Sequence, residues 1–306
     1  MGIESQWIWM DGELVPFENA TTHVLSHTLH YGLGAFEGIR AYIQPDGRAG
    51  VWRLDEHLQR LVHSASVLRV SMPYGVEQLR AACLEVLRAN DFTAAYLRPL
   101  MFLGSGEMGL GARSNKVHVV VAAWKWGAYL GEEGLRNGVH LRTSSFTRNH
   151  PNAALPRAKV VGHYVNSILA RYEANEDGYD EGLMLDHTGM VAEGTGENIF
   201  IVDGSTLRTP PPTNILPGFT RETIFEIVEH APDLTLLEQP FGRDALYTAD
   251  EAFMVGTAAE VTPIAHLDRR QIGRGTRGPV TERIQSVYRD AVRGKVDWMK
   301  HHITTV

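Results

Sequence analysis

The chain of 306 residues is poor in cysteine and lysine. Cys83 is the only cysteine, so no intrachain disulfide can form and motifs built on cysteine pairs are excluded. This usage is typical of a reducing setting, and we expect a cytoplasmic protein. Lysine accounts for five of the 29 basic residues: Lys116, Lys125, Lys159, Lys295 and Lys300. Any chemistry that needs a lysine amine therefore has few candidates.

Long apolar runs and a basic charge balance are also missing. The longest apolar run, Val119–Trp124, is far shorter than the roughly 20 residues that span a bilayer. The first six residues do not resemble a signal peptide, so none is expected. Lys and Arg number 29 against 36 Asp and Glu, which gives a formal net charge of −7. Nucleic acid and anionic membranes select a basic face, so neither is expected as a main partner.

The length favours two domains, and short strand and helix patterns alternate in both halves, which indicates an α/β (α+β) fold. Asp11-Gly12 predicts a hairpin turn, and Asp55 is a candidate cap for a helix that ends near Leu68. A glycine-rich stretch after Trp126 is typical of a linker. We therefore place a small N-terminal domain at residues 1–130, an interdomain linker at 131–137 and a larger C-terminal domain at 138–306.

Two tempting motifs favour ordinary structural roles. The segment Gly273–Gly278 matches G-x-G-x-x-G, but the residues before it are too polar for a buried strand. A loop before a C-terminal helix is the better interpretation, and a nicotinamide-dependent oxidoreductase is only a remote alternative. His23, His27 and His30 have helical spacing, but no carboxylate or cysteine nearby completes a familiar metal set. We expect no metal site.

Four segments carry more information. Lys159 lies between an apolar strand region and a helix, where it is either part of a buried ion pair or a reactive amine. Glu193 stands in a glycine-rich turn that feeds a strand. The segment Leu216–Arg221 opens a helix whose N-terminus suits phosphate, although Thr220 could simply cap it. The small residues 256–259 follow an apolar strand and leave backbone N–H groups open to a ligand.

A lysine amine, a carboxylate and two phosphate-suited backbone segments are the set that pyridoxal 5′-phosphate requires. The lysine holds the aldehyde, and the carboxylate keeps the pyridine nitrogen protonated. The N–H groups and a hydroxyl hold the phosphate.

In this order and spacing the four segments resemble the branched-chain amino-acid aminotransferases, which are fold-type IV pyridoxal-phosphate enzymes. The resemblance covers nearly the whole chain. It also includes His30–Gly32, Phe36–Arg40, Arg53–Arg60, Ala95–Pro99 and Trp126–Leu130. It implies a small α/β domain and a larger pseudo-barrel domain with the cofactor between them. The implied partners are amino acids, 2-oxo acids and a second copy of the chain, because the family site borrows residues across a subunit interface.

The resemblance also implies residue roles. Lys159 forms the Schiff base with the cofactor and then moves the proton between substrate and cofactor. The expected cofactor-binding residues are Arg60, Lys159, Tyr164, Glu193, Phe219, Thr220 and Thr257. The expected substrate-binding residues are Tyr31, Phe36, Gly38, Tyr96, Arg98, Leu110, Trp126, Tyr129 and Ala258. Among these, Tyr31 and Leu110 come from the partner subunit, and Arg98 with Tyr31 receives the distal carboxylate of glutamate.

The implied reaction is ping-pong transamination of leucine, isoleucine or valine with 2-oxoglutarate, as part of amino-acid biosynthesis. A D-amino-acid transaminase or an aminodeoxychorismate lyase of the same fold is the nearest alternative. The segments Tyr96–Arg98 and Gly256–Ala259 favour the branched-chain activity. A non-enzymatic binding protein is a remote alternative, which Lys159 and Glu193 disfavour.

Overall fold

The computed structural model describes residues 5–127 and 129–306; Ala128, which belongs to the motif Trp126–Leu130, lies outside them. The chain divides into two compact units. The first contains the residues up to Trp126, together with Ala158–His163 and Ala291–Val306. The second contains Gly127–Arg157 and Tyr164–Asp290. Lys159 therefore belongs to the first unit and Glu193 to the second.

The first unit is built on an antiparallel sheet with the strand order β17-β5-β4-β6-β7-β1-β2, and β3 pairs with β6. Its strands are β1 (Trp7–Met10), β2 (Glu13–Pro16), β3 (Gly34–Phe36), β4 (Ile39–Ile43), β5 (Ala49–Trp52), β6 (Ala95–Leu103), β7 (Val117–Trp124) and β17 (Ile303–Thr305). Its helical segments are η1 (Phe17–Asn19), α1 (His27–Tyr31), α2 (Leu54–Val67), α3 (Val76–Ala89), η2 (Val161–His163) and η3 (Asp297–His302).

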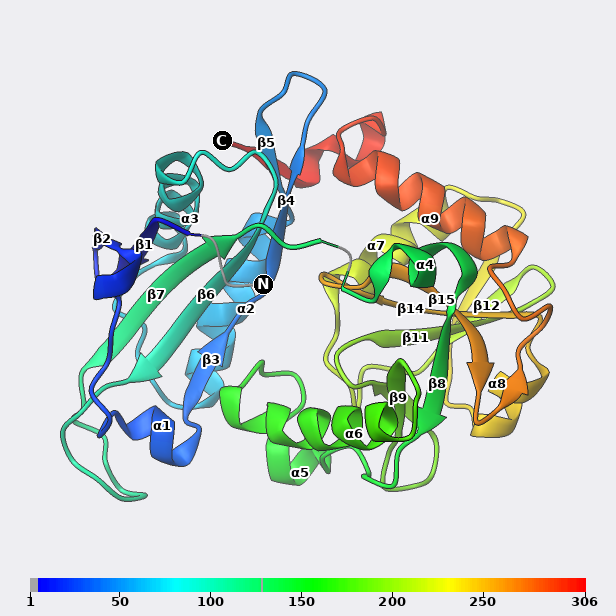
Figure 1. Ribbon diagram of the computed structural model, residues 1–306, viewed down its shortest axis with the longest axis horizontal. Helices are drawn as coiled ribbons and strands as arrows, with labels where there is room; N and C mark the ends of the chain where they lie inside the picture. Colours follow the sequence, from blue (N-terminus) through cyan, green and yellow to red (C-terminus); the bar gives the residue numbers. More distant parts are fainter. Residues whose placement is uncertain (1–4, 128) are drawn as a thin grey trace. The chain divides into compact units, whose positions relative to one another are not determined.

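Helices α2 and α3 lie against this sheet and close its core (Figure 1). Leu58, Leu61 and Leu79 are completely buried between the helices and the strands. Cys83 lies in the same core, where burial raises the pKa of its thiol to about 12. The single cysteine is thus a packing residue without a reactive thiolate.

The second unit has a mixed sheet with the strand order β10-β9-β8-β15-β14-β11-β12-β13, and β16 pairs with β15. Its strands are β8 (Val139–Thr143), β9 (Glu181–Leu185), β10 (Val191–Gly194), β11 (Asn198–Asp203), β12 (Thr206–Thr209), β13 (Thr235–Glu238), β14 (Glu251–Gly256), β15 (Glu260–Leu267) and β16 (Arg270–Gln271). Its helices are α4 (Gly131–Asn137), α5 (Pro151–Ala154), α6 (Tyr164–Glu176), α7 (Phe219–Glu229), α8 (Arg243–Thr248) and most of α9 (Pro279–Val292).

Local expectations from the sequence meet the structure with mixed results. The hairpin at Asp11-Gly12 is confirmed, because Trp7–Met10 pairs with Glu13–Pro16. The stretch expected as a linker, residues 131–137, forms helix α4 and groups with the second unit. The predicted cap at Asp55 is wrong, since Arg53 precedes α2 and Asp55 binds Arg80 instead. In the described part of the chain, no helix is long and apolar enough to cross a membrane.

Candidate active site

The segment around Lys159 is fixed at three backbone points within the first unit. The Lys159 N–H donates to Ser64 Oγ at 3.0 Å, and the Phe36 N–H donates to the Lys159 carbonyl at 3.1 Å. Val160 forms an antiparallel bridge with Ala35. The Lys159 side chain is half-buried, and its Nζ lies 5.3 Å from the centre of the Phe36 ring. The amine thus projects from a rigid segment beside an aromatic residue of the expected substrate pocket.

Helix α2 carries a polar face that holds a buried carboxylate. Glu37 is completely buried and accepts hydrogen bonds from Arg60 Nε at 2.6 Å and Arg60 Nη2 at 3.0 Å. His57 Nδ1 lies 2.6 Å from the same carboxylate, which can only accept, so the Nδ1 atom carries a proton. His57, Arg60 and Ser64 lie near one face of the helix because they are three and four residues apart. The bidentate pair fixes the guanidinium of Arg60, the expected phosphate ligand.

Burial and charge set the protonation of this cluster. Burial alone would raise the pKa of Glu37, but the charge of Arg60 and the contact with His57 hold that pKa well below its ordinary value. Burial lowers the pKa of His57 against the opposing pull of Glu37. The cluster is therefore best described as a carboxylate, a guanidinium and a neutral imidazole.

Aromatic residues of strands β3, β6 and β7 surround Arg98. The guanidinium carbon lies 4.8 Å from the Phe36 ring centre, 5.3 Å from that of Tyr96 and 5.6 Å from that of Trp124. Arg98 Nη2 also donates to the Tyr96 hydroxyl at 3.4 Å. A Cβ atom on Gly38 would stand 1.9 Å from that hydroxyl, so only glycine fits there. Contacts with aromatic faces hold the cation while the pocket stays apolar.

Glu193 is the centre of a hydrogen-bond network in the second unit. Arg148 Nε donates to its Oε1 at 2.7 Å, and Asn198 Nδ2 and the Leu216 N–H each donate to its Oε2 at 3.3 Å. The residue is 4% exposed. A buried carboxylate that accepts from a guanidinium and an N–H stays ionised, which is the state that pairs with a protonated pyridine nitrogen.

Two of the expected phosphate ligands, Phe219 and Thr220, come shortly after Leu216 in the chain. Helix α7 begins at Phe219 with Gly218 as its N-cap residue, so the alternative in which Thr220 caps the helix is wrong. A Cβ on Gly218 would stand 2.3 Å from Asn198 Oδ1, which explains the glycine. Thr257 and Ala258 occupy the tight turn between β14 and β15. The N-terminus of a helix offers N–H groups to a phosphate, and a turn of small residues offers N–H groups to a carboxylate.

The remaining predicted residues are more exposed. The exposed fractions are 43% for Tyr31, 91% for Leu110, 36% for Trp126 and 37% for Tyr129. Trp126 packs edge-on against Tyr96, with ring centres 4.6 Å apart. The first unit thus gathers Phe36, Gly38, Tyr96, Arg98, Trp126 and Lys159, and Arg60 lies on the adjacent polar face of α2. The second unit holds Tyr129, Tyr164, Glu193, Phe219, Thr220, Thr257 and Ala258.

The glycine-rich segment and the histidine series, for which the sequence favoured structural roles, make structural contacts. The glycine-rich segment Gly273–Gly278 is a loop, and the first N–H groups of α9 bind the carboxylate of Glu251 at 3.0 and 2.8 Å. That helix end is therefore occupied and cannot take a pyrophosphate. His23, His27 and His30 each meet a backbone group of a different residue.

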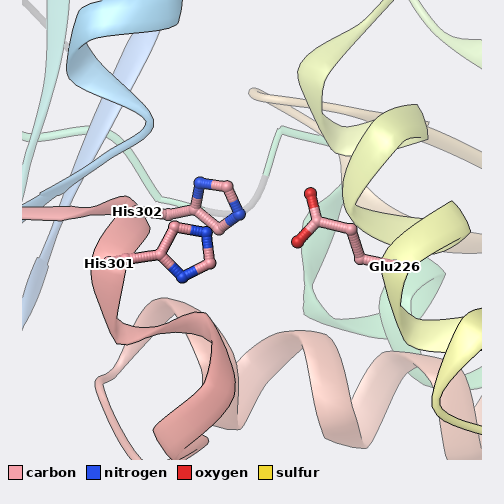
Figure 2. Close-up of side chains that lie close together, drawn as sticks. All are labelled: Glu226, His301 and His302. Carbon is pink, nitrogen blue, oxygen red and sulfur yellow. The ribbon is translucent and has the colours of Figure 1, made fainter.

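Two further histidines stand out at the end of η3, where the rings of His301 and His302 lie 3.9 Å apart (Figure 2). His302 is engaged within the first unit, with Nδ1 3.2 Å from Glu56 and Nε2 3.1 Å from Arg53. Glu226, drawn in the same view, belongs to α7 of the second unit. The contacts of His302 indicate that it fastens the C-terminal segment.

A scan against family models matches residues 34–267 to the family of class IV amino-transferases. The chain belongs to this family. It is 52% identical over 291 residues to the branched-chain-amino-acid aminotransferase of Pseudomonas aeruginosa, and the match covers 95% of this chain and 94% of the relative. Among solved structures, the branched-chain amino acid aminotransferase of T.th. with pyridoxamine 5′-phosphate matches with a TM-score of 0.96 and 45% identity, over 99% of both chains. The same enzyme complexed with N-(5′-phosphopyridoxyl)-L-glutamate matches with a TM-score of 0.95 and 44% identity, again over 99% of both.

These matches confirm the predicted fold class, a two-domain α/β fold of type IV. The sequence interpretation missed the residues that hold the site residues in place: Glu37, His57, Arg148 and Asn198. One signal was available, because Glu37 is the only charged residue in the otherwise apolar stretch Leu33–Ile39. A carboxylate in such a stretch requires a buried cation.

Proposed function

We propose that the chain catalyses transamination between branched-chain L-amino acids and 2-oxoglutarate with pyridoxal 5′-phosphate as cofactor. The observation that carries the proposal is the Lys159 amine, which lies beside Phe36 and extends from a backbone held by Ser64, in a chain 52% identical to a branched-chain-amino-acid aminotransferase. The relatives favour this activity over a D-amino-acid transaminase or an aminodeoxychorismate lyase. The pyridoxamine 5′-phosphate bound to the solved T.th. relative supports the cofactor.

The residues present suit this cofactor. When bound, it accepts the electron pair that the substrate Cα releases with its proton. Lys159 takes the proton from the α-carbon and returns it to the cofactor carbon. Glu193 binds the pyridine nitrogen, and Tyr164 donates to the phenolic oxygen. Arg60, Thr257 and the backbone at Phe219 and Thr220 bind the phosphate.

The substrate pocket has to accept both apolar and acidic side chains. Tyr96 and the backbone at Thr257 and Ala258 bind the α-carboxylate. Phe36, Gly38, Trp126, Tyr129 and Tyr164 line the apolar part. Arg98 receives the distal carboxylate of glutamate, whose phosphopyridoxyl adduct is bound in the T.th. relative. When leucine occupies the pocket, no carboxylate pairs with Arg98. Its guanidinium is then stabilised by the faces of the Phe36 and Tyr96 rings.

The active protein is a homodimer at least, with Tyr31 and Leu110 reaching the site of the partner subunit. The exposed apolar residues support this proposal. Helix α6 presents Val165, Ile168, Leu169 and Tyr172 at helical spacing, with exposed fractions of 60%, 44%, 42% and 61%. Leu29 on α1 is 65% exposed. A row of exposed apolar side chains on one helix face, as on α6, is typical of an interaction site. A cytoplasmic location remains a prediction.

The test is a substrate panel with the purified protein and added pyridoxal 5′-phosphate. We expect 2-oxoglutarate-dependent turnover of L-leucine, L-isoleucine and L-valine, with no turnover of the D-enantiomers. Turnover of D-alanine or D-glutamate at comparable rates would refute the branched-chain assignment. Sedimentation measures the oligomeric state, and an active monomer would contradict the role of Tyr31 and Leu110.

A further inference from the structure

Arg148 connects elements that carry different expected cofactor ligands. It lies in the loop between β8 and α5, and its Nε donates to Glu193 Oε1 on β10 at 2.7 Å. Its Nη1 donates to Ser167 Oγ at 3.1 Å and reaches Asn166 Oδ1 at 3.4 Å, both in the first turn of α6. Helix α6 begins at Tyr164. One guanidinium therefore joins the carboxylate and the helix that carries the tyrosine.

The loop that carries Arg148 is itself held at two points. The Arg148 N–H donates to the Leu185 carbonyl on β9 at 2.8 Å, and Asn166 Nδ2 donates to the Thr147 carbonyl at 3.1 Å. The Arg148 side chain is 11% exposed and that of Glu193 is 5% exposed. A rigid backbone and a desolvated ion pair leave this guanidinium little freedom.

We propose that Arg148 is a positioning residue for the cofactor: it keeps the Glu193 carboxylate ionised and directed, and it fixes the start of α6 relative to that carboxylate. The proposal rests on the proposed function, since it assumes that Glu193 and Tyr164 bind opposite edges of one pyridine ring. Arg148 does not itself touch the cofactor. It acts through the two residues that do.

The two parts of this role have separate consequences. A guanidinium next to a buried carboxylate stabilises the ionised form, so its removal makes Glu193 accept a proton at a higher pH. A protonated Glu193 lacks the negative charge that stabilises a protonated pyridine nitrogen. Cofactor affinity should then fall as the pH is lowered. Loss of the bridge to Ser167 weakens affinity at every pH, because α6 is less well placed.

The experiment compares Arg148→Met, which removes charge and hydrogen bonds, with Arg148→Lys, which keeps the charge but lacks the guanidinium fork that joins Glu193 to Ser167. Arg142→Met is the matched control. Arg142 lies on β8 of the same unit and also binds α6 and the residue that follows it, through the Glu173 carbonyl and Asp177, but it does not contact Glu193. Equilibrium dialysis of the full-length chain against pyridoxal 5′-phosphate gives the dissociation constant between about pH 6 and about pH 9, a range in which an exposed carboxyl does not titrate.

For Arg148→Met we expect affinity lower than that of the wild type by a factor on the order of ten to a hundred at the lowest pH, as for the loss of a charge-assisted hydrogen bond, with a smaller factor at the highest pH. Arg148→Lys should restore the wild-type pH profile with a uniform loss of affinity. If Arg148→Met follows Arg142→Met at every pH, the proposal is overturned. If both Arg148 variants lose affinity equally at all pH values, the charge role is wrong. A wild type that binds no cofactor would instead refute the proposed function.

Discussion

Replacement of Glu37 by glutamine tests the electrostatic centre of the first unit. The buried carboxylate accepts from His57 Nδ1 and Arg60 Nε at 2.6 Å each, and from Arg60 Nη2 at 3.0 Å. Glutamine has nearly the same volume but brings no charge, and its amide group points donors at donors. Removal of one partner from a buried ion pair costs about 3 to 5 kcal/mol, because the other charge is left uncompensated. We expect Glu37→Gln to lower the free energy of unfolding by about that amount.

The assay is urea unfolding at neutral pH, with Glu85→Gln as the control. Glu85 lies exposed on α3 of the same unit, so the same chemical change there should stay within about 0.5 kcal/mol of the wild type. The denaturant midpoint should fall in Glu37→Gln with an unchanged m-value. A midpoint equal to that of Glu85→Gln would refute the account of Glu37 as a charged clamp for Arg60.

The pH dependence of stability gives a second readout of the same cluster. The depressed pKa of Glu37 means that its stabilisation is complete above its ordinary value of 4.5 and is lost as the pH falls below it. His57 also has a depressed pKa. Below its ordinary pKa of 6.5, this imidazole binds a proton in the unfolded chain but stays neutral in the folded protein. Both groups therefore make stability rise with pH. In Glu37→Gln the slope below about pH 4.5 should be shallower, because one of the two groups is gone.

Three further substitutions test the proposed chemistry. Lys159→Ala should abolish steady-state transamination, measured by glutamate formation from leucine, while the protein still binds pyridoxal 5′-phosphate through its phosphate contacts. Glu193→Gln should keep the fold but raise the barrier by about 3 to 4 kcal/mol, and full rate at saturating cofactor would contradict its electronic role. Arg98→Ala should weaken the half-reaction with glutamate roughly ten- to a hundredfold more than that with leucine, as single-turnover kinetics will show. Equal losses would identify Arg98 as a structural residue.

Local chemistry made parts of the fold predictable. Asp11-Gly12 predicts its hairpin because both residues tolerate positive φ, and the structure has φ values of 53° and 109° there. The cap of α2 failed for the opposite reason. Arg80, 25 residues away, binds both oxygens of Asp55 at 2.6 and 2.7 Å and so recruits the carboxylate that would have capped the helix. A local signal is reliable only where no distant residue competes for the same side chain.

The residues of the candidate site likewise differ in whether the local sequence reveals them. Lys159 and Glu193 stand in distinctive segments, so their positions could be inferred from the sequence. Arg148 could not, because its partner lies 45 residues further along the chain, and the two meet only after β8 pairs with β9 and β9 pairs with β10. Its sequence neighbours, Thr147 and Asn149, resemble those of any polar loop. Lys159 and Glu193 therefore stand in recognisable motifs, whereas Arg148, which holds Glu193, does not.

Glu37 lies between these cases and shows how such residues can be found. Its place in the otherwise apolar stretch Leu33–Ile39 predicts burial, and a buried carboxylate requires a cation. Arginines stand nearby at positions 40, 53 and 60, so the sequence leaves the partner open. In the structure Arg40 turns to the Trp126 carbonyl and Arg53 lies beside His302, which leaves the carboxylate to Arg60. The local sequence thus predicts that Glu37 is buried. Which of the three arginines pairs with it depends on the sheet and on the C-terminal segment, which engage Arg40 and Arg53.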